Sequence, residues 1–122
     1  MKALGIRADV TVAADIDRLV SETARTFRRI DVLVNNAGGA RAAEDDDSWQ
    51  AAYEVNLLAA VRASRAVAPH MRAAGGGSII HIASIWGREG GGAATYNAMK
   101  AAMISHAKNL ALALAPDGIR VN

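Results

Sequence analysis

The sequence predicts an α/β fold in which a parallel sheet is combined with helices. Short apolar runs rich in β-branched residues, at 31–35 and 78–83, are typical of strands that are buried on both faces of a parallel sheet. Longer segments between these runs carry apolar residues at helical spacing, and strands that alternate with helices indicate parallel α/β units. The 122 residues are expected to form a single domain.

The first part of the chain is predicted to contain two strands separated by a helix. The first strand is expected from Leu4 to Val10. An amphipathic helix from about Ala14 to Arg29 follows, because its apolar residues recur at helical spacing. The run Asp31 to Asn35 (DVLVN) is the next strand, and it ends abruptly in the small and polar residues at 36–39.

Four further elements are predicted in the second part of the chain. Short polar side chains accept hydrogen bonds from the amides of a helix's first turn, so Asp47 or Ser48 is expected to cap a long helix. Glycines at 75–77 end this helix. The predicted elements are a helix from Asp47 or Ser48 to about Ala74, a strand from Ser78 to Ala83, a helix from Thr95 to Ala115, and a strand from Ile119 to Asn122.

The composition argues against several classes of protein. The 14 basic and 12 acidic residues are interspersed, so no basic surface for nucleic acid is indicated. The absence of cysteine excludes disulfides and thiolate chemistry. The most apolar helix candidate, at 53–71, is interrupted by charges, and the apolar stretch near the start is too short for a secretory signal. A cytoplasmic protein without a membrane partner is therefore expected.

The stretch from Ser84 to Lys100 carries the strongest indication of chemistry. Tyr96 and Lys100 are four residues apart in a predicted helix, so they share a face and an ammonium can lie near a phenol. Such a pair is weak evidence alone, because any helix can carry a packed tyrosine and a solvated lysine. Ser84 follows the strand at 78–83, where a helix cap or turn is the alternative explanation.

A loop after a strand and a polar residue in an apolar helix are two further features that a ligand site would explain. The loop at 35–38 (NNAG) directly follows an apolar strand, and α/β sheets bind ligands at the carboxyl ends of their strands. Its small residues would let a flat or phosphorylated ligand approach the backbone, although an ordinary turn is the alternative. Asn56 lies in an apolar helix, where a buried asparagine must find hydrogen-bond partners.

The sequence resembles the short-chain dehydrogenase/reductase family, because it carries that family's motifs in the same order: NNAG, a helical asparagine, a serine and YxxxK. The matching segments run from about Ile6 to Asn122. The resemblance implies a partial Rossmann-like, doubly wound parallel sheet with helices on both faces. It implies an oxidoreductase that uses NAD or NADP and transfers hydride between nicotinamide and a carbonyl or secondary alcohol. An epimerase or dehydratase built on the same YxxxK is an alternative, but NNAG favours the dehydrogenase branch.

The resemblance also implies a role for each residue. Tyr96 would be the general acid/base, Ser84 would polarise the substrate oxygen, and Lys100 would hold the nicotinamide ribose. Asn56 would position a water that links Lys100 to solvent. The implied catalytic residues are Asn56, Ser84, Tyr96 and Lys100, and the implied cofactor-binding residues are Asp9, Val10, Asn36, Ala37, Gly38, Tyr96 and Lys100.

Other residues that often carry chemistry have simpler explanations. Trp86 is expected either to form part of a substrate wall or to serve in packing. No metal site is predicted, because His70, His81 and His106 are scattered singly and are interpreted as surface or packing residues. The acidic run at 45–47 is better explained as charge at the start of a helix.

The family's glycine-rich phosphate-binding turn has no counterpart before Leu4, and its substrate lid has none near Asn122. In the strand order 3-2-1-4-5-6, the first predicted strand here lacks its neighbours. The chain is therefore expected to be a single incomplete domain, a central fragment that does not turn over substrate alone. The rival hypothesis is an inactive interaction module. In either case a homo-oligomer is expected, formed through the helices near 48–74 and 95–115.

Overall fold

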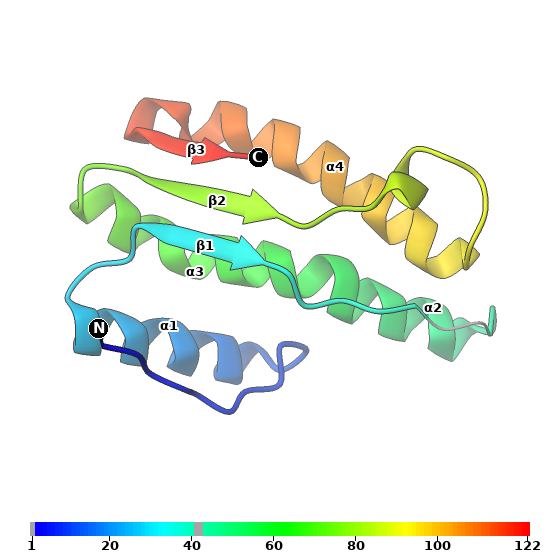
Figure 1. Ribbon diagram of the computed structural model, residues 1–122, viewed down its shortest axis with the longest axis horizontal. Helices are drawn as coiled ribbons and strands as arrows, with labels where there is room; N and C mark the ends of the chain where they lie inside the picture. Colours follow the sequence, from blue (N-terminus) through cyan, green and yellow to red (C-terminus); the bar gives the residue numbers. More distant parts are fainter. Residues whose placement is uncertain (1, 41–42) are drawn as a thin grey trace.

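The computed structural model describes residues 2–40 and 43–122, and it contains a three-stranded parallel sheet (Figure 1). The strands lie in the order β1-β2-β3, with Val32 of β1 opposite Ser78 of β2, and Ser78 opposite Arg120 of β3. This confirms the predicted α/β class with a parallel, Rossmann-like sheet. The strands are β1 (Val32–Asn35), β2 (Gly77–His81) and β3 (Ile119–Val121).

The helices connect these strands and pack on one face of the described sheet. Parallel connections are right-handed, and each step here moves to the next strand in the same direction, so the connecting helices fall on one side. Figure 1 shows α3 behind β1 and β2. The helices are α1 (Ala13–Phe27), α2 (Asp46–Tyr53), a π-helix η1 (Glu54–Leu58), α3 (Ala59–Ala73), a short η2 (Ile85–Gly87), α4 (Ala94–Leu114) and a short η3 (Ala115–Asp117).

The hydrophobic core lies between the sheet and this helical layer. Ile79 of β2 and Met71 of α3 are completely buried, and Val20 of α1 packs in the same cluster. On the opposite face, Val32 and Val34 are 55% and 52% exposed. Helices were expected on both faces of the sheet. In the described part of the chain they cover one face only.

The strand expected from Leu4 to Val10 is not formed, so this prediction is wrong. The segment has no regular structure, and it turns into α1 through a hydrogen bond from Val12 N to Asp9 O of 3.0 Å. Among the described residues β1 is an edge strand, so the segment has no ladder to join. A strand without a neighbour leaves its backbone groups to water, and high strand propensity does not replace those hydrogen bonds.

The long helix begins earlier than predicted and is interrupted. Asp45 is the N-cap, because its Oδ1 accepts a hydrogen bond of 2.8 Å from Ser48 N, so neither Asp47 nor Ser48 caps the helix. Three adjacent aspartates are chemically equivalent as caps, and only the path of the chain selects one. The π-helix η1 was not predicted. The bounds of the other predicted elements lie within two residues of the observed ones.

The last helix ends as its sequence predicts. Pro116 follows α4 within the short η3, and Gly118 then adopts a left-handed backbone at φ 71°, which allows the chain to turn into β3. Within the described ranges, no helix combines the length and the apolar character that crossing a membrane requires.

Candidate active site

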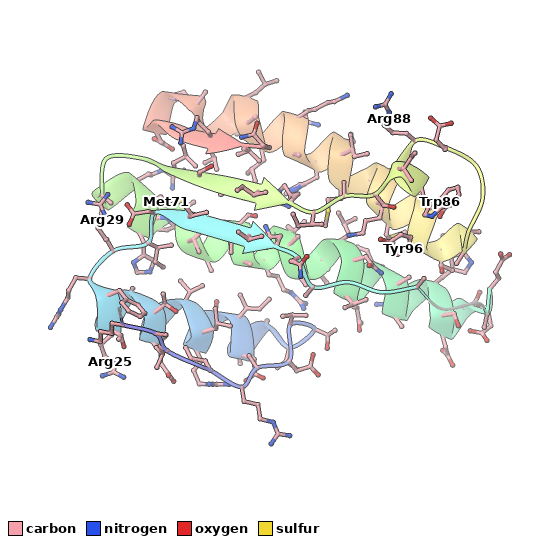
Figure 2. All side chains as sticks on the ribbon, viewed as in Figure 1. Arg25, Arg29, Met71, Trp86, Arg88 and Tyr96 are labelled. Atoms are coloured by element: carbon pink, nitrogen blue, oxygen red, sulfur yellow. The ribbon has the colours of Figure 1, made fainter. Side chains whose placement is uncertain are left out.

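The candidate site lies at the carboxyl ends of β1 and β2. Four segments meet there: the loop at 36–40 after β1, the short helix η2 after β2, the π-helix η1, and the first turns of α4. Figure 2 shows Tyr96 and Trp86 at this end of the molecule. The topology therefore gathers residues as far apart in the sequence as Gly38 and Lys100 at one edge of the sheet.

Lys100 is a buried cation beside a tyrosine. Its side chain is 3% exposed, and its Nζ donates a hydrogen bond of 2.6 Å to the carbonyl oxygen of Ile82. The same Nζ lies 5.4 Å from the centroid of the Tyr96 ring, one helical turn earlier. Burial lowers the pKa of Lys100 below its ordinary value, because a low-dielectric environment disfavours the charged form.

Asn56 clamps the loop that follows β1. It is completely buried in η1, and its Oδ1 accepts a hydrogen bond of 2.9 Å from Gly39 N. Its Nδ2 donates to Gly39 O at 2.9 Å and to Ala52 O at 3.1 Å, so both amide protons are used by backbone carbonyls. A π-helix inserts one extra residue into a turn and is frequent at functional sites, and here it carries the residue that holds the loop.

Gly38 lies where the loop, Asn56 and Lys100 meet. A Cβ atom at Gly38 would lie 2.7 Å from Asn56 Oδ1 and 3.4 Å from Lys100 Nζ. The first distance is shorter than a non-bonded contact allows, so glycine is the residue that fits here without displacing the asparagine. The structure thus brings together three of the residues that the sequence selects.

Three of the remaining residues selected for cofactor binding border a groove beside β1. Val10, Asn36 and Ala37 line a cavity of about 130 Å³ together with apolar residues of α1 and α3. Asp9 is exposed at the turn before α1, where its Oδ1 accepts hydrogen bonds from Thr11 N at 2.9 Å and Thr11 Oγ1 at 2.7 Å. These hydrogen bonds from Thr11 lower the pKa of Asp9.

Ser84 is the N-cap of η2 in this structure. Its Oγ accepts a hydrogen bond of 3.2 Å from Trp86 N. Among the described residues, Ser84 and Tyr96 form no hydrogen bond with each other. Gly87 of η2 presses against α4, because a Cβ there would lie 2.9 Å from the carbonyl carbon of Lys100. Ser84 is therefore held beside the helical turn that carries Tyr96 and Lys100.

A buried polar cluster under the site was not predicted. Asn35 Nδ2 lies 3.2 Å from Ser64 Oγ and 3.2 Å from His81 Nδ1, and the rings of His81 and His106 pack edge to face with centroids 5.6 Å apart. Burial is the main cause that lowers the pKa of His81 to about 4. The contact between His81 and His106 was not predicted, but it agrees with the interpretation of these histidines as packing residues. The available signal was that His81 lies two positions after Ile79, on the inward face of the strand.

Comparison with known proteins agrees with the geometry. Residues 1–122 match the family model described as short chain dehydrogenase. The chain is 38% identical to the short-chain reductase protein NovJ of Streptomyces niveus, over 99% of this chain and 48% of that protein. It is 38% identical to the 3-oxoacyl-[acyl-carrier-protein] reductase of Synechocystis sp., over 99% of this chain and 51% of that protein.

A solved structure shows the same fold. The crystal structure of a short chain dehydrogenase from Mycobacterium smegmatis is 31% identical and superposes with a TM-score of 0.91, over 96% of this chain and 51% of that chain. The chain spans about half the length of the curated relatives it matches. Because the family model matches the whole sequence, the protein belongs to the short-chain dehydrogenase/reductase family of oxidoreductases.

Proposed function

We propose that the protein is an NAD(P)-dependent oxidoreductase that transfers hydride between nicotinamide and a carbonyl or secondary alcohol. The observation that carries this proposal is the buried Lys100 ammonium, 5.4 Å from the ring centroid of Tyr96. A buried cation without a carboxylate partner is costly, and within the described residues Lys100 forms no ion pair. Perturbed and costly groups of this kind cluster at functional sites.

The residues present fit a nicotinamide dinucleotide. Lys100 donates one hydrogen bond, to Ile82 O, among the described residues, so two of its three N–H groups are available for ribose hydroxyls. Gly38 places no side chain between the loop and this ammonium. The groove of about 130 Å³ lined by Val10 and Asn36 would contact only a part of the rest of the dinucleotide. When it is bound, the nicotinamide supplies or accepts the hydride.

The protein's own side chains would manage the proton. Tyr96 would give its phenolic proton to the substrate oxygen during reduction and take it back during oxidation. Lys100 Nζ lies 5.4 Å from the centroid of the Tyr96 ring, so a positive charge stands beside this phenol. Because Ser84 Oγ accepts from Trp86 N, its own proton can be donated to the substrate oxygen. Asn56 would act as a positioning residue that keeps the loop against Lys100.

Paired tyrosine variants test this assignment. The purified chain is given NADH or NADPH with a panel of ketones, and binding of NADH is followed separately by fluorescence. Tyr96→Phe is expected to lower the rate of ketone reduction by about 10²- to 10⁴-fold, the usual contribution of acid/base catalysis. Tyr53→Phe, at an exposed position of α2, is expected to keep the rate. If the unchanged chain reduces ketones, equal rates for the two variants would contradict the role of Tyr96.

The same assay addresses the isolated chain. We predict that the 122 residues alone do not turn over substrate. Turnover at ordinary enzyme rates would contradict this prediction. Absence of both NADH binding and turnover would argue against the proposed function and favour an interaction module.

We further propose self-association through the helices near 48–74 and 95–115. Trp49 and Tyr53, four residues apart on α2, both remain exposed, and Leu112 of α4 is exposed as well. Exposed aromatic residues are enriched at protein interfaces. Sedimentation velocity is expected to show a dimer or larger species, and a monomer at high concentration would contradict the proposal.

A further inference from the structure

The indole of Trp86 rests on the backbone of the glycine loop that precedes α4. A Cβ at Gly91 would lie 2.7 Å from the indole Cζ3 and 3.0 Å from Cη2, and one at Gly92 would lie 3.7 Å from Cδ1 and Cδ2. The six-membered ring therefore covers Gly91 and the five-membered ring covers Gly92. Both glycines have positive φ values, +121° and +72°, which side-chain-bearing residues rarely adopt. The loop thus forms a flat seat for one face of the ring.

This seat is fastened to the proposed catalytic residues. Asn97, the residue after Tyr96, donates a hydrogen bond from its Nδ2 to Gly91 O. On the other side, Trp86 N donates to Ser84 Oγ at 3.2 Å. The glycine loop under the indole is therefore tied to the helix that carries the proposed acid/base, and the backbone of Trp86 is tied to the serine that would bind the substrate oxygen.

Part of Trp86 is open to solvent. The residue stays 40% exposed although the glycine loop contacts its ring, and its neighbour Ile85 is more exposed still. Figure 2 shows Trp86 and Tyr96 at the same end of the molecule, whereas Arg88 points away from them. A role in packing explains the covered face but not the exposed one. A large aromatic ring that is held rigidly at the surface loses little freedom when a ligand stacks on it.

We propose that Trp86 determines substrate specificity by stacking against a flat, aromatic substituent of the carbonyl substrate. Aromatic rings prefer offset stacking on an indole face, and a puckered saturated ring of the same size makes poorer contact with it. The substrate class is thus an aryl ketone or aryl aldehyde, in preference to its saturated counterpart. This inference rests on the proposed function, because it names the substrate class of the same site.

Nuclear magnetic resonance of the whole chain tests the inference without requiring turnover. The protein has two tryptophans, so Trp49→Phe assigns the two indole N–H signals. The chain is titrated with acetophenone and with cyclohexyl methyl ketone, each with and without NADH. Acetophenone is expected to shift the Trp86 signal saturably and leave the Trp49 signal in place, with at least about fivefold tighter binding than the saturated ketone. Equal affinities, or no shift of Trp86 under either condition, would overturn the inference.

Variants then separate stacking from folding. Trp86→Leu is expected to remove the preference for the aryl ketone, Trp86→Phe to retain most of it, and Phe27→Leu, at an exposed aromatic position of α1, to leave it unchanged. If the chain reduces ketones in the turnover assay, the effect of Trp86→Leu is expected in KM and not in kcat, since Tyr96 is untouched. If Trp86→Leu fails to fold, the titration of the unchanged chain decides.

The experiments also distinguish a failure of the stacking inference from a failure of the proposed function. A specific shift of Trp86 without turnover supports the stacking site while the reaction fails. Turnover without discrimination between the two ketones overturns the inference and leaves the reaction standing.

Discussion

The ammonium of Lys100 donates a 2.6 Å hydrogen bond to the carbonyl oxygen of Ile82, the first residue after β2. This contact ties the second turn of α4 to the end of the central strand, and it fixes the position of a buried positive charge. A neutral carbonyl only partly compensates such a charge. The arrangement leaves the ammonium available for a ligand with hydroxyl groups.

Replacing Lys100 tests that availability. Lys100→Met keeps the length and apolar stem of the side chain and removes its charge. It is expected to weaken NADH binding about tenfold, in line with the loss of one or two charge-assisted hydrogen bonds. Lys108→Met, at an exposed position of the same helix, is the matched control and is expected to bind NADH normally. Fluorescence titration measures both, and equal affinities would argue against a cofactor role for Lys100.

Neighbouring glycines in the loop after β1 are expected to differ in their tolerance of alanine. A Cβ at Gly38 meets Asn56 Oδ1 at 2.7 Å, whereas one at Gly39 meets nothing within 4 Å. Gly38→Ala should therefore lower the free energy of unfolding by about 1–3 kcal/mol, as overpacking does. Gly39→Ala should change it by less than about 0.5 kcal/mol. Urea denaturation compares the two, and similar midpoints would show that the contact at Gly38 is easily relieved.

The clamp formed by Asn56 is expected to stabilise the fold. Asn56→Ala leaves the N–H and C=O of Gly39 without their buried partner, so a loss of about 2–3 kcal/mol in the free energy of unfolding is expected. Asn109→Ala provides the comparison, because Asn109 is exposed and makes a single hydrogen bond to Ser105 O. If Asn56→Ala lowers the free energy of unfolding as little as Asn109→Ala does, the hydrogen bonds of Asn56 to Gly39 do not stabilise the fold.

His81 should make stability depend on pH. Its pKa is about 4 in the folded chain and about 6.5 when unfolded, because burial disfavours the charged ring. Below pH 6.5 the unfolded chain therefore binds more protons, and stability that is fully present above that pH decreases as the pH falls towards 4. The total loss is up to about 3 kcal/mol.

Urea denaturation between pH 7.5 and 4 measures this loss. His81→Asn is expected to flatten the dependence but not to abolish it, because burial lowers the pKa of His106 as well. His70→Asn, in α3, serves as the control. Parallel curves for the original chain and His81→Asn would contradict the assignment.

The order of helices and strands was predictable because it depends on the spacing of apolar residues within each short segment. Apolar residues at a spacing of 3.6 define α1, the β-branched runs define β1 and β2, and the proline and glycine at 116 and 118 mark the end of α4. The approach of Lys100 to Tyr96 was predictable for the same reason, since residues four apart on a helix always share a face. Gly38 and Asn56 were recognised as site residues, but not as direct neighbours of each other.

The sequence by itself determined the fold class and most element bounds, because these depend on spacing within one element, and the order of its motifs suggested the residues of the candidate site. Only the tertiary structure decided which segments find partners. Leu4 to Val10 has strand-forming residues but no neighbouring strand, so it forms none. Asn35 and His81 are 46 residues apart and meet because β1 pairs with β2 in one particular register. Hydrogen bonds and burial depend on that pairing, and pairing is a property of the whole chain.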